Sequence, residues 1–175
     1  MTALVFVDTN VLVYARDAAQ RAKQPLAADW VARLWREQTG RISMQVLSEY
    51  YVTVTRKLEP GLKQADAWDD VRALLSWGPQ PIDATLIQRA REIEQRHRLA
   101  WWDSLIVGAA QLQNCTVLLS EDLQDGGAYG GVTVRSPFTF AINEPAAAYP
   151  APPVVARSHP PRGRPASRRA SGLPR

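Results

Sequence analysis

The sequence predicts an α/β sandwich whose sheet is mainly parallel. Short apolar, β-branched runs alternate along the chain with longer segments in which apolar residues recur at helical spacing, and no internal repeat is visible. At 175 residues the chain is the size of one ordinary domain. Such a domain can bury roughly 70% of its unfolded surface in a single core.

The first half of the chain predicts two strands and four helices. Residues 3–7 form an apolar run typical of a strand buried on both faces. Asp8 ends the run, and Thr9 and Asn10 are good N-cap residues for the next helix. Helices are predicted at residues 11–15, 23–37, about 45–58 and 64–77, with a short strand at residues 41–44.

The second half predicts two helices and two clear strands. A helix capped by Asp83 or Thr85 extends to about Arg98, and a mostly buried helix follows at residues 103–112. The clear strands are at residues 116–119 and 132–134, separated by the turn-rich segment LQDGGAYGG, and residues 81–82 are a candidate for a strand stub.

Charge is divided unevenly along the chain. Residues 1–144 carry 15 Lys and Arg against all 17 acids, whereas residues 145–175 carry six Arg and no acid. The second segment is rich in Pro, Ala, Ser and Arg and lacks apolar periodicity, so we expect a folded domain at 1–144 and a disordered tail at 145–175. The tail is either a solvated extension or a non-specific RNA contact.

Cysteine content and hydropathy favour a cytoplasmic protein. Cys115 is the lone cysteine, and its apolar surroundings are typical of a small buried hydrophobe. No basic region precedes the first apolar run, which Asp8 interrupts well short of the roughly 20 residues that a membrane span needs.

Acidic residues follow three predicted strands and begin one buried helix. Asp8 ends the first strand, Glu49 lies one turn into the helix after the second, and Asp122 lies beyond the strand at 116–119. Asp103 starts a helix whose dipole favours a negative charge. Because sites in open parallel sheets form outside the carboxyl ends of the strands, we expect these acids along one edge.

Clustered carboxylates of this kind predict a bound cation. An unpaired charge such as that of Asp8, inside an apolar run, costs several kcal/mol to bury. Carboxylates also repel one another, so a fold that gathers them usually supplies a positive partner. Hard oxygen ligands without His or Cys point to Mg²⁺ or Mn²⁺, ions that many nucleases use to cleave phosphodiesters.

Each acid also has a purely structural alternative. Asp8 can cap the helix that follows it, and Asp103 can be an ordinary first-turn acid. Glu49 lies about 130° from the centre of its helix's apolar stripe, as a solvated glutamate would. Asp122 can be a loop acid, and Asp125, which stands in a turn, is more often only that.

Aromatic residues are less informative than the acids. Three tryptophans lie on apolar helix stripes and are expected in the core: Trp30, Trp35 and Trp68. Trp101 and Trp102 stand beside Asp103, where they can stack a nucleic-acid base, although packing at the start of the helix is the safer interpretation. His97 lies between two arginines and is expected in solvent, without a catalytic role.

Four segments carry the acids: VFVDTNVLVYA with Asp8, SMQVLSEYYVTVTRK with Glu49, WWDSLIVGAA with Asp103, and LLSEDLQDG with Asp122 and Asp125. In this order and spacing they resemble the PIN-domain family, and most closely its VapC-like toxin ribonucleases of bacterial toxin-antitoxin pairs. The resemblance covers the chain from about residue 2 to residue 138, which leaves out the Arg-rich tail.

The resemblance implies a three-layer α/β/α sandwich with about five parallel strands. It implies Mg²⁺-dependent endoribonuclease activity that leaves a 5′-phosphate and a 3′-hydroxyl. Its acidic quartet falls on Asp8, Glu49, Asp103 and Asp122 as catalytic and metal-ligating residues, of which Asp8 and Asp103 are the most direct ligands. A homodimer and inhibition by a cognate antitoxin protein are implied as well.

The match also includes supporting positions and two departures. Residues at positions that orient acids or water in the family are Thr9, Asn10 and Ser43. The family's last motif usually opens with Thr and has Phe after its final acid, whereas here Ser120 opens it and Gly126 follows Asp125. Whether Asp125 takes part is therefore left open.

Four rival functions fit parts of the pattern. A haloacid-dehalogenase-type phosphatase needs a second aspartate where this chain has Asn10, and a receiver domain needs further acids and a late Lys that are not evident. A catalytically silent PIN-like module that binds RNA or protein is the strongest rival. A housekeeping RNA-processing nuclease without an antitoxin is the fourth.

Overall fold

The computed structural model describes residues 3–139, and the predicted tail at 145–175 lies outside them. Strands and helices alternate along these residues, as predicted. In chain order the elements are β1 (Val5–Val7), α1 (Thr9–Arg16), α2 (Lys23–Glu37), β2 (Gly40–Arg41), α3 (Met44–Arg56), α4 (Gln64–Leu74), the 3₁₀ turn η1 (Leu75–Trp77), α5 (Ala84–His97), α6 (Trp101–Leu112), β3 (Val117–Leu119), β4 (Ala128–Tyr129) and β5 (Val132–Arg135).

The strands form one five-stranded sheet in the order β2-β1-β3-β5-β4. β1 lies parallel to both β2 and β3, and β3 lies parallel to β5, whereas β4 pairs antiparallel with β5. Val7, the last residue of β1, is opposite Leu119, the last residue of β3. The mainly parallel sheet is thereby confirmed, and the two central strands end side by side.

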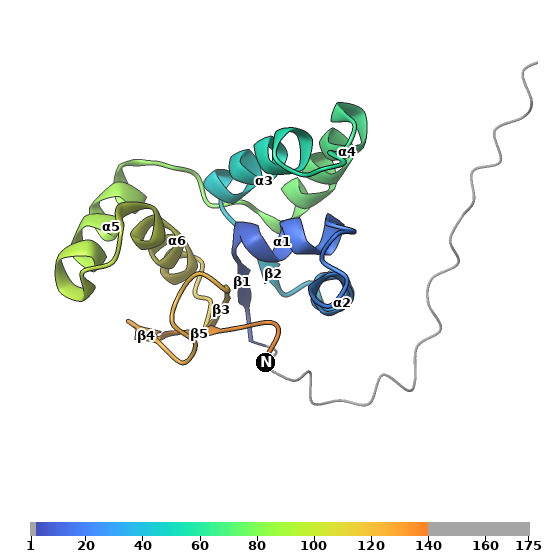
Figure 1. Cartoon of the computed structure of the whole chain (residues 1–175). Coiled ribbons are helices and arrows are strands. Elements are labelled where there is room, and N and C mark those ends of the chain that lie inside the picture. Colours follow the sequence, from blue (N-terminus) through green and yellow to red (C-terminus); the bar gives the residue numbers. More distant parts are fainter. Residues whose placement is uncertain (1–2, 140–175) are drawn as a thin grey trace, which may run out of the picture. The chain divides into compact units, whose positions relative to one another are not determined.

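Helices cover both faces of this sheet. Figure 1 shows α5 and α6 on one side of β1 and β3, and α1, α2, α3 and α4 on the other. α5 packs along α6, and α1 packs against α2 and α3. The arrangement is the three-layer sandwich that the resemblance implies. No helix within residues 3–139 is long and apolar enough to cross a membrane.

The central strands are apolar throughout because both of their faces are covered. Phe6, Val7, Leu118 and Leu119 are completely buried. A strand in this position leaves no face for solvent. The residue that follows β1 therefore stands at the edge of a dry core, which matters because that residue is Asp8.

α1 is capped by Asp8, so the prediction that Thr9 and Asn10 cap this helix was wrong. The Asp8 backbone is extended, and its side chain accepts a hydrogen bond from the Thr9 amide. Thr9 and Asn10 are instead the first two residues of the helix. The helix starts before its apolar spacing begins, and this leaves both side chains available for contacts with other segments.

Among the strands, β2, the predicted stub at residues 81–82 and β4 also differ from the prediction. β2 covers Gly40–Arg41 rather than 41–44, because the Ser43 hydroxyl accepts a hydrogen bond from the Val46 amide and caps α3. Residues 81–82 form no strand. β4 was not predicted, and it joins β5 through Gly130 and Gly131, whose φ angles are both positive, as a two-residue hairpin turn requires.

Two of the three tryptophans expected in the core are partly exposed. Trp30 is 5% exposed, but Trp35 and Trp68 are 37% and 53% exposed, so the prediction was wrong for both. The Trp35 ring packs on Trp77 with centroids 5.1 Å apart, and the Trp68 ring packs edge-on against Tyr51 at 6.3 Å. Each ring covers the rim of the core while its outer edge meets water.

Cys115 offers a simple test of the packing. The residue is 3% exposed, as expected, and burial raises the pKa of its thiol to about 12. Because the thiolate is the reactive form, we expect the native protein to react with a thiol reagent at pH 8 at least ~100-fold more slowly than in urea. Equal rates in the two conditions would contradict the burial of this thiol.

Candidate active site

Asp8 is a buried carboxylate at the carboxyl end of β1. Only 8% of it is exposed, and three donors hold its oxygens: the Thr9 amide at 2.7 Å, the Ser120 hydroxyl at 2.7 Å and the Asn10 side-chain amide at 2.9 Å. Burial raises the pKa of Asp8 to about 6, the hydrogen bonds from Ser120 and Thr9 lower it, and the negative charges of Asp122 and Glu49 raise it. The donors therefore offset only part of the cost of burying this anion.

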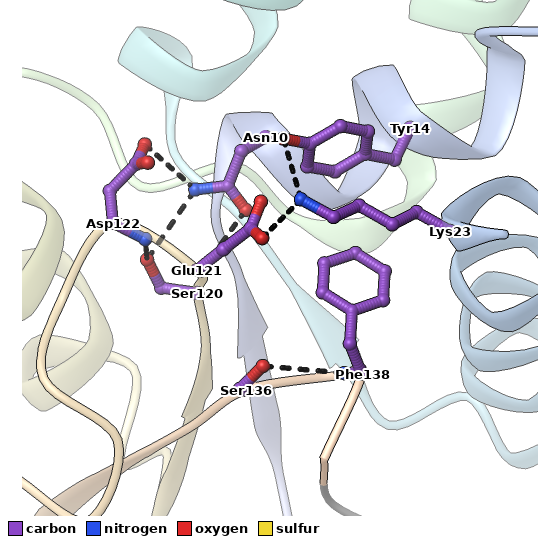
Figure 2. Close-up of polar contacts among 8 residues, drawn as sticks. All are labelled: Asn10, Tyr14, Lys23, Ser120, Glu121, Asp122, Ser136 and Phe138. Atoms are coloured by element: carbon purple, nitrogen blue, oxygen red, sulfur yellow. Dashed lines mark hydrogen bonds and ion pairs between the residues drawn. The ribbon is translucent and has the colours of Figure 1, made fainter. Parts of the chain in front are cut away.

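Asn10 connects Asp8 to the loop that follows β3. Its Nδ2 donates to an Asp8 oxygen at 2.9 Å and to an Asp122 oxygen at 3.0 Å, while its Oδ1 accepts from the Glu121 amide at 3.3 Å. Figure 2 shows the Asn10 side chain between Asp122 and Glu121. The Asp122 amide in turn donates to the Ser120 hydroxyl at 3.1 Å. One amide side chain thus ties two acids and the loop to β1.

Glu49 is held by two donors from different segments. The Thr9 hydroxyl donates to one Glu49 oxygen at 2.8 Å, and the Gln45 side-chain amide donates to the other at 2.9 Å. Gln45 lies one turn earlier on α3 and is itself 4% exposed. The contact with Thr9 brings α3 against the start of α1, so Glu49 faces the same edge of the sheet as Asp8.

Asp103 lies in the first turn of α6 and is half-buried. Burial raises its pKa, and the negative charges of Asp122 and Glu49 raise it further. The same two acids raise the pKa of Asp8. The charges of Glu49 and Asp122 therefore reach both Asp8 and Asp103, which brings acids from four separate segments to the carboxyl end of the central strands.

Asp125 and Ser43 have contacts elsewhere. The Asp125 carboxylate accepts hydrogen bonds from the Ser136 amide at 3.0 Å and the Thr139 hydroxyl at 3.3 Å, and it lies 3.5 Å from the Arg135 guanidinium. It thus holds the segment after β5. Ser43, which was expected to orient an acid or a water, accepts a hydrogen bond from the Val46 amide and caps α3.

The donor chemistry of the four acids suits a hard divalent cation. They offer carboxylate oxygens, with neutral oxygens from Ser120, Asn10 and Thr9 nearby, and Mg²⁺ prefers such ligands. Within residues 3–139 no three acidic, His or Cys side chains converge into a group that could hold an ion. The Asn10 amide lies between Asp8 and Asp122, and donors occupy both Glu49 oxygens. For three of these acids to bind one ion, some of these hydrogen-bond donors must therefore move away from the carboxylate oxygens.

Three contacts of the site were not predicted. Gln45 supports Glu49, and Glu121 contacts Asn10 through its backbone and Lys23 through its side chain. Gln45 could have been found, because residues four apart on a helix are neighbours. The Lys23 contact spans 98 residues of sequence, and no local pattern indicates it.

Trp102, the residue before Asp103, is exposed. We expected Trp101 and Trp102 to pack at the start of the helix, and Trp101 does pack against the core. Trp102 is 62% exposed, so for this residue the expectation was wrong. Its carbonyl accepts a hydrogen bond from Gln45 at 3.5 Å, which places its backbone near Glu49. His97 is half-buried against Tyr129, with ring centroids 5.1 Å apart, rather than in solvent.

The raised pKa of Asp8 makes the stability of the metal-free protein depend on pH. The folded state holds this proton more tightly than the unfolded state, so the group favours folding below about pH 4, and the advantage is lost as the pH rises through about 6. A shift of about two units corresponds to about 3 kcal/mol. In EDTA we expect the free energy of unfolding, relative to Asp8→Asn, to fall by about that amount between pH 4 and pH 7. Parallel pH curves from urea unfolding of the two proteins would contradict it.

Comparisons with known proteins identify the family of this chain. Residues 5–124 match the family described as PIN domain. No curated protein sequence shows a significant match to the chain.

Two solved structures share the fold. One is Mycobacterium tuberculosis VapC20, a toxin that cleaves the sarcin-ricin loop; it has 22% sequence identity and a TM-score of 0.52, over 67% of this chain and 91% of that one. The other is a toxin-antitoxin complex from Klebsiella pneumoniae, with 19% identity and a TM-score of 0.55, over 76% of this chain and 97% of that one. The family match spans more than half of the sequence and includes Asp8, Glu49, Asp103 and Asp122, so the chain belongs to the PIN-domain family.

Proposed function

We propose that this protein is a divalent-cation-dependent endoribonuclease and the toxin of a toxin-antitoxin pair. The observation that carries the proposal is the gathering of acids at the carboxyl end of the sheet: Asn10 bonds both Asp8 and Asp122, Thr9 bonds Glu49, and the charges of Glu49 and Asp122 raise the pKa of both Asp8 and Asp103. Membership of the PIN-domain family supports it, and so does the fold shared with VapC20 and with the Klebsiella complex.

Asp8 and Asp103 are the residues that we expect to hold the cation, and Glu49 and Asp122 would complete the set. Mg²⁺ suits these oxygen donors best, and Mn²⁺ has similar preferences. When bound, the ion supplies positive charge that holds the scissile phosphate, lowers the pKa of a water and stabilises the leaving oxygen.

The remaining polar residues of the site position the acids. Asn10 and Ser120 fix Asp8 and the Asp122 loop, while Thr9 and Gln45 fix Glu49. Such partners matter because a carboxylate that can swing freely loses the geometry that a hard cation requires. In this proposal the buried Asp8 is the fixed point, and the three more exposed acids are arranged around it.

Cleavage of synthetic single-stranded RNA tests the activity. We expect Mg²⁺-dependent cleavage that EDTA abolishes, and we expect Asp8→Asn and Asp103→Asn each to lower the rate by a factor of about 10³ or more. Asp29→Asn, which changes an exposed acid on α2, is the matched control and should cleave like wild type. Mg²⁺ at about 100 times its dissociation constant should also raise the free energy of unfolding of the wild type by roughly 2.7 kcal/mol, and that of Asp8→Asn by much less.

The outcomes separate this proposal from its rivals. If the protein binds RNA but does not cleave it with any divalent cation, it is a silent binding module and the proposed nuclease activity is wrong. Cleavage by a protein whose expression does not arrest growth would indicate a housekeeping nuclease. Growth arrest that requires Asp8, and that a small protein encoded by the neighbouring gene relieves, would support the toxin and its antitoxin partner. Light scattering would test the proposed homodimer.

Trp102 is a candidate for stacking a base of the RNA. An exposed indole on the residue before Asp103 suits an unpaired base, and base–aromatic stacking is worth about 1–3 kcal/mol by alanine substitution. We expect Trp102→Ala to raise KM for single-stranded RNA by the factor that corresponds to this free energy, while the melting temperature stays unchanged. Trp102→Phe should retain most of the affinity. Trp68→Ala, at another exposed indole, is the control. An unchanged KM together with loss of the dimer would instead assign Trp102 to a protein interface.

A further inference from the structure

Lys23 begins α2 and reaches the loop that follows β3. Its Nζ forms an ion pair with the Glu121 carboxylate and donates to the Tyr14 hydroxyl at 3.4 Å. The same nitrogen lies 4.7 Å from the centroid of the Tyr14 ring and 5.2 Å from that of the Phe138 ring. Figure 2 shows the end of Lys23 between the two rings, so this flexible side chain is fixed from several sides.

The groups around the Lys23 amine come from separate parts of the fold. Tyr14 lies on α1, and Phe138 lies in the segment after β5, where its amide donates to the Ser136 hydroxyl at 3.4 Å. The rings of Tyr14 and Phe138 pack edge to face, with centroids 5.4 Å apart. The amine therefore sits where three segments meet, and each of them limits its movement.

Glu121 links this cluster to the acids. It stands between Ser120, which donates to Asp8, and Asp122, which accepts from Asn10. Its backbone amide donates to Asn10, and its side chain binds Lys23. The side chains of Lys23 and Glu121 are 35% and 30% exposed, and partly exposed ion pairs add little to overall stability. This ion pair therefore acts mainly on the position of the loop after β3.

We propose that Lys23 is a positioning residue for the acidic site. By holding Glu121, it keeps the loop against Asn10 and so sets the place of Asp122 among the acids. It also neutralises Glu121, which is a further acid in the same loop, one residue before Asp122. The inference rests on the proposed nuclease function for its effect on catalysis, but the contact itself can be tested without catalysis.

A direct contact of Lys23 with an RNA phosphate is the main alternative. The amine already has an anion, a hydroxyl and two rings as neighbours, which favours the positioning role. The two roles predict different kinetics. A phosphate contact would raise KM and flatten its salt dependence. A positioning residue would instead change kcat and the concentration of Mg²⁺ that is needed.

The kinetic experiment uses Lys23→Ala, Glu121→Gln, the double variant and Lys23→Arg. Outer partners of metal ligands typically contribute 10–100-fold to metal affinity or activity, so for both single variants we expect about a 10-fold loss in kcat or rise in the half-saturating Mg²⁺, with KM for RNA unchanged. The double variant should lose no more than either single, because both act through one contact. Lys23→Arg should stay near wild type. Lys63→Ala removes the same charge from an exposed site and is the control.

A second measurement needs no activity. In the metal-free protein, the side-chain amide NMR signals of Asn10, identified by their loss in Asn10→Asp, should shift in Lys23→Ala and Glu121→Gln but not in Lys63→Ala. Unmoved Asn10 signals would overturn the inference, and so would wild-type kcat and Mg²⁺ dependence in an active enzyme, or a change confined to KM. If the wild type cleaves no RNA but the Asn10 signals shift, the positioning contact stands and the proposed nuclease fails.

Discussion

The burial of the Asp8 carboxylate is the constraint on which the rest of the site depends. β1 is covered on both faces, so an anion at its end has little water and needs donors from neighbouring segments. One of these donors, Ser120, directly follows β3, and its hydroxyl reaches Asp8 because Val7 pairs with Leu119. A slip of one residue in this register would turn Ser120 to the opposite face and leave the anion without that donor. The geometry of the site therefore depends on the register of the sheet.

Periodicity predicted the sheet and the helices well, but it predicted the depth of side chains poorly. The bounds of α2 follow its apolar stripe from Lys23 to Glu37, whereas Trp35 and Trp68 lie on such stripes and still face solvent. A stripe gives the direction of a side chain, and the distance to the core depends on what packs opposite. The hairpin of β4 and β5 was missed although Gly130-Gly131 is a turn signal, because strands of two residues carry too little pattern.

In the site, likewise, the sequence predicts some features and not others. The ends of strands in a parallel sheet converge, so the acids could be placed on one edge from the order of strands and helices alone. The donors between them could not, since the contacts of Thr9 with Glu49 and of Asn10 with Asp122 join segments 40 and 112 residues apart. The cap of α1 was misjudged for a related reason: a first turn has no apolar period, so only the structure shows that Asp8 caps the helix and leaves Thr9 and Asn10 free for these contacts.

The order of the strands also has a consequence for how the protein is made. β3 lies between β1 and β5 in the sheet, yet it follows all six described helices in the chain. A ribosome must therefore synthesise all six of these helices before β1 gains its central neighbour and Asp8 gains Ser120. A product that stops earlier lacks Asp122, and its Asp8 carboxylate lacks the Ser120 donor.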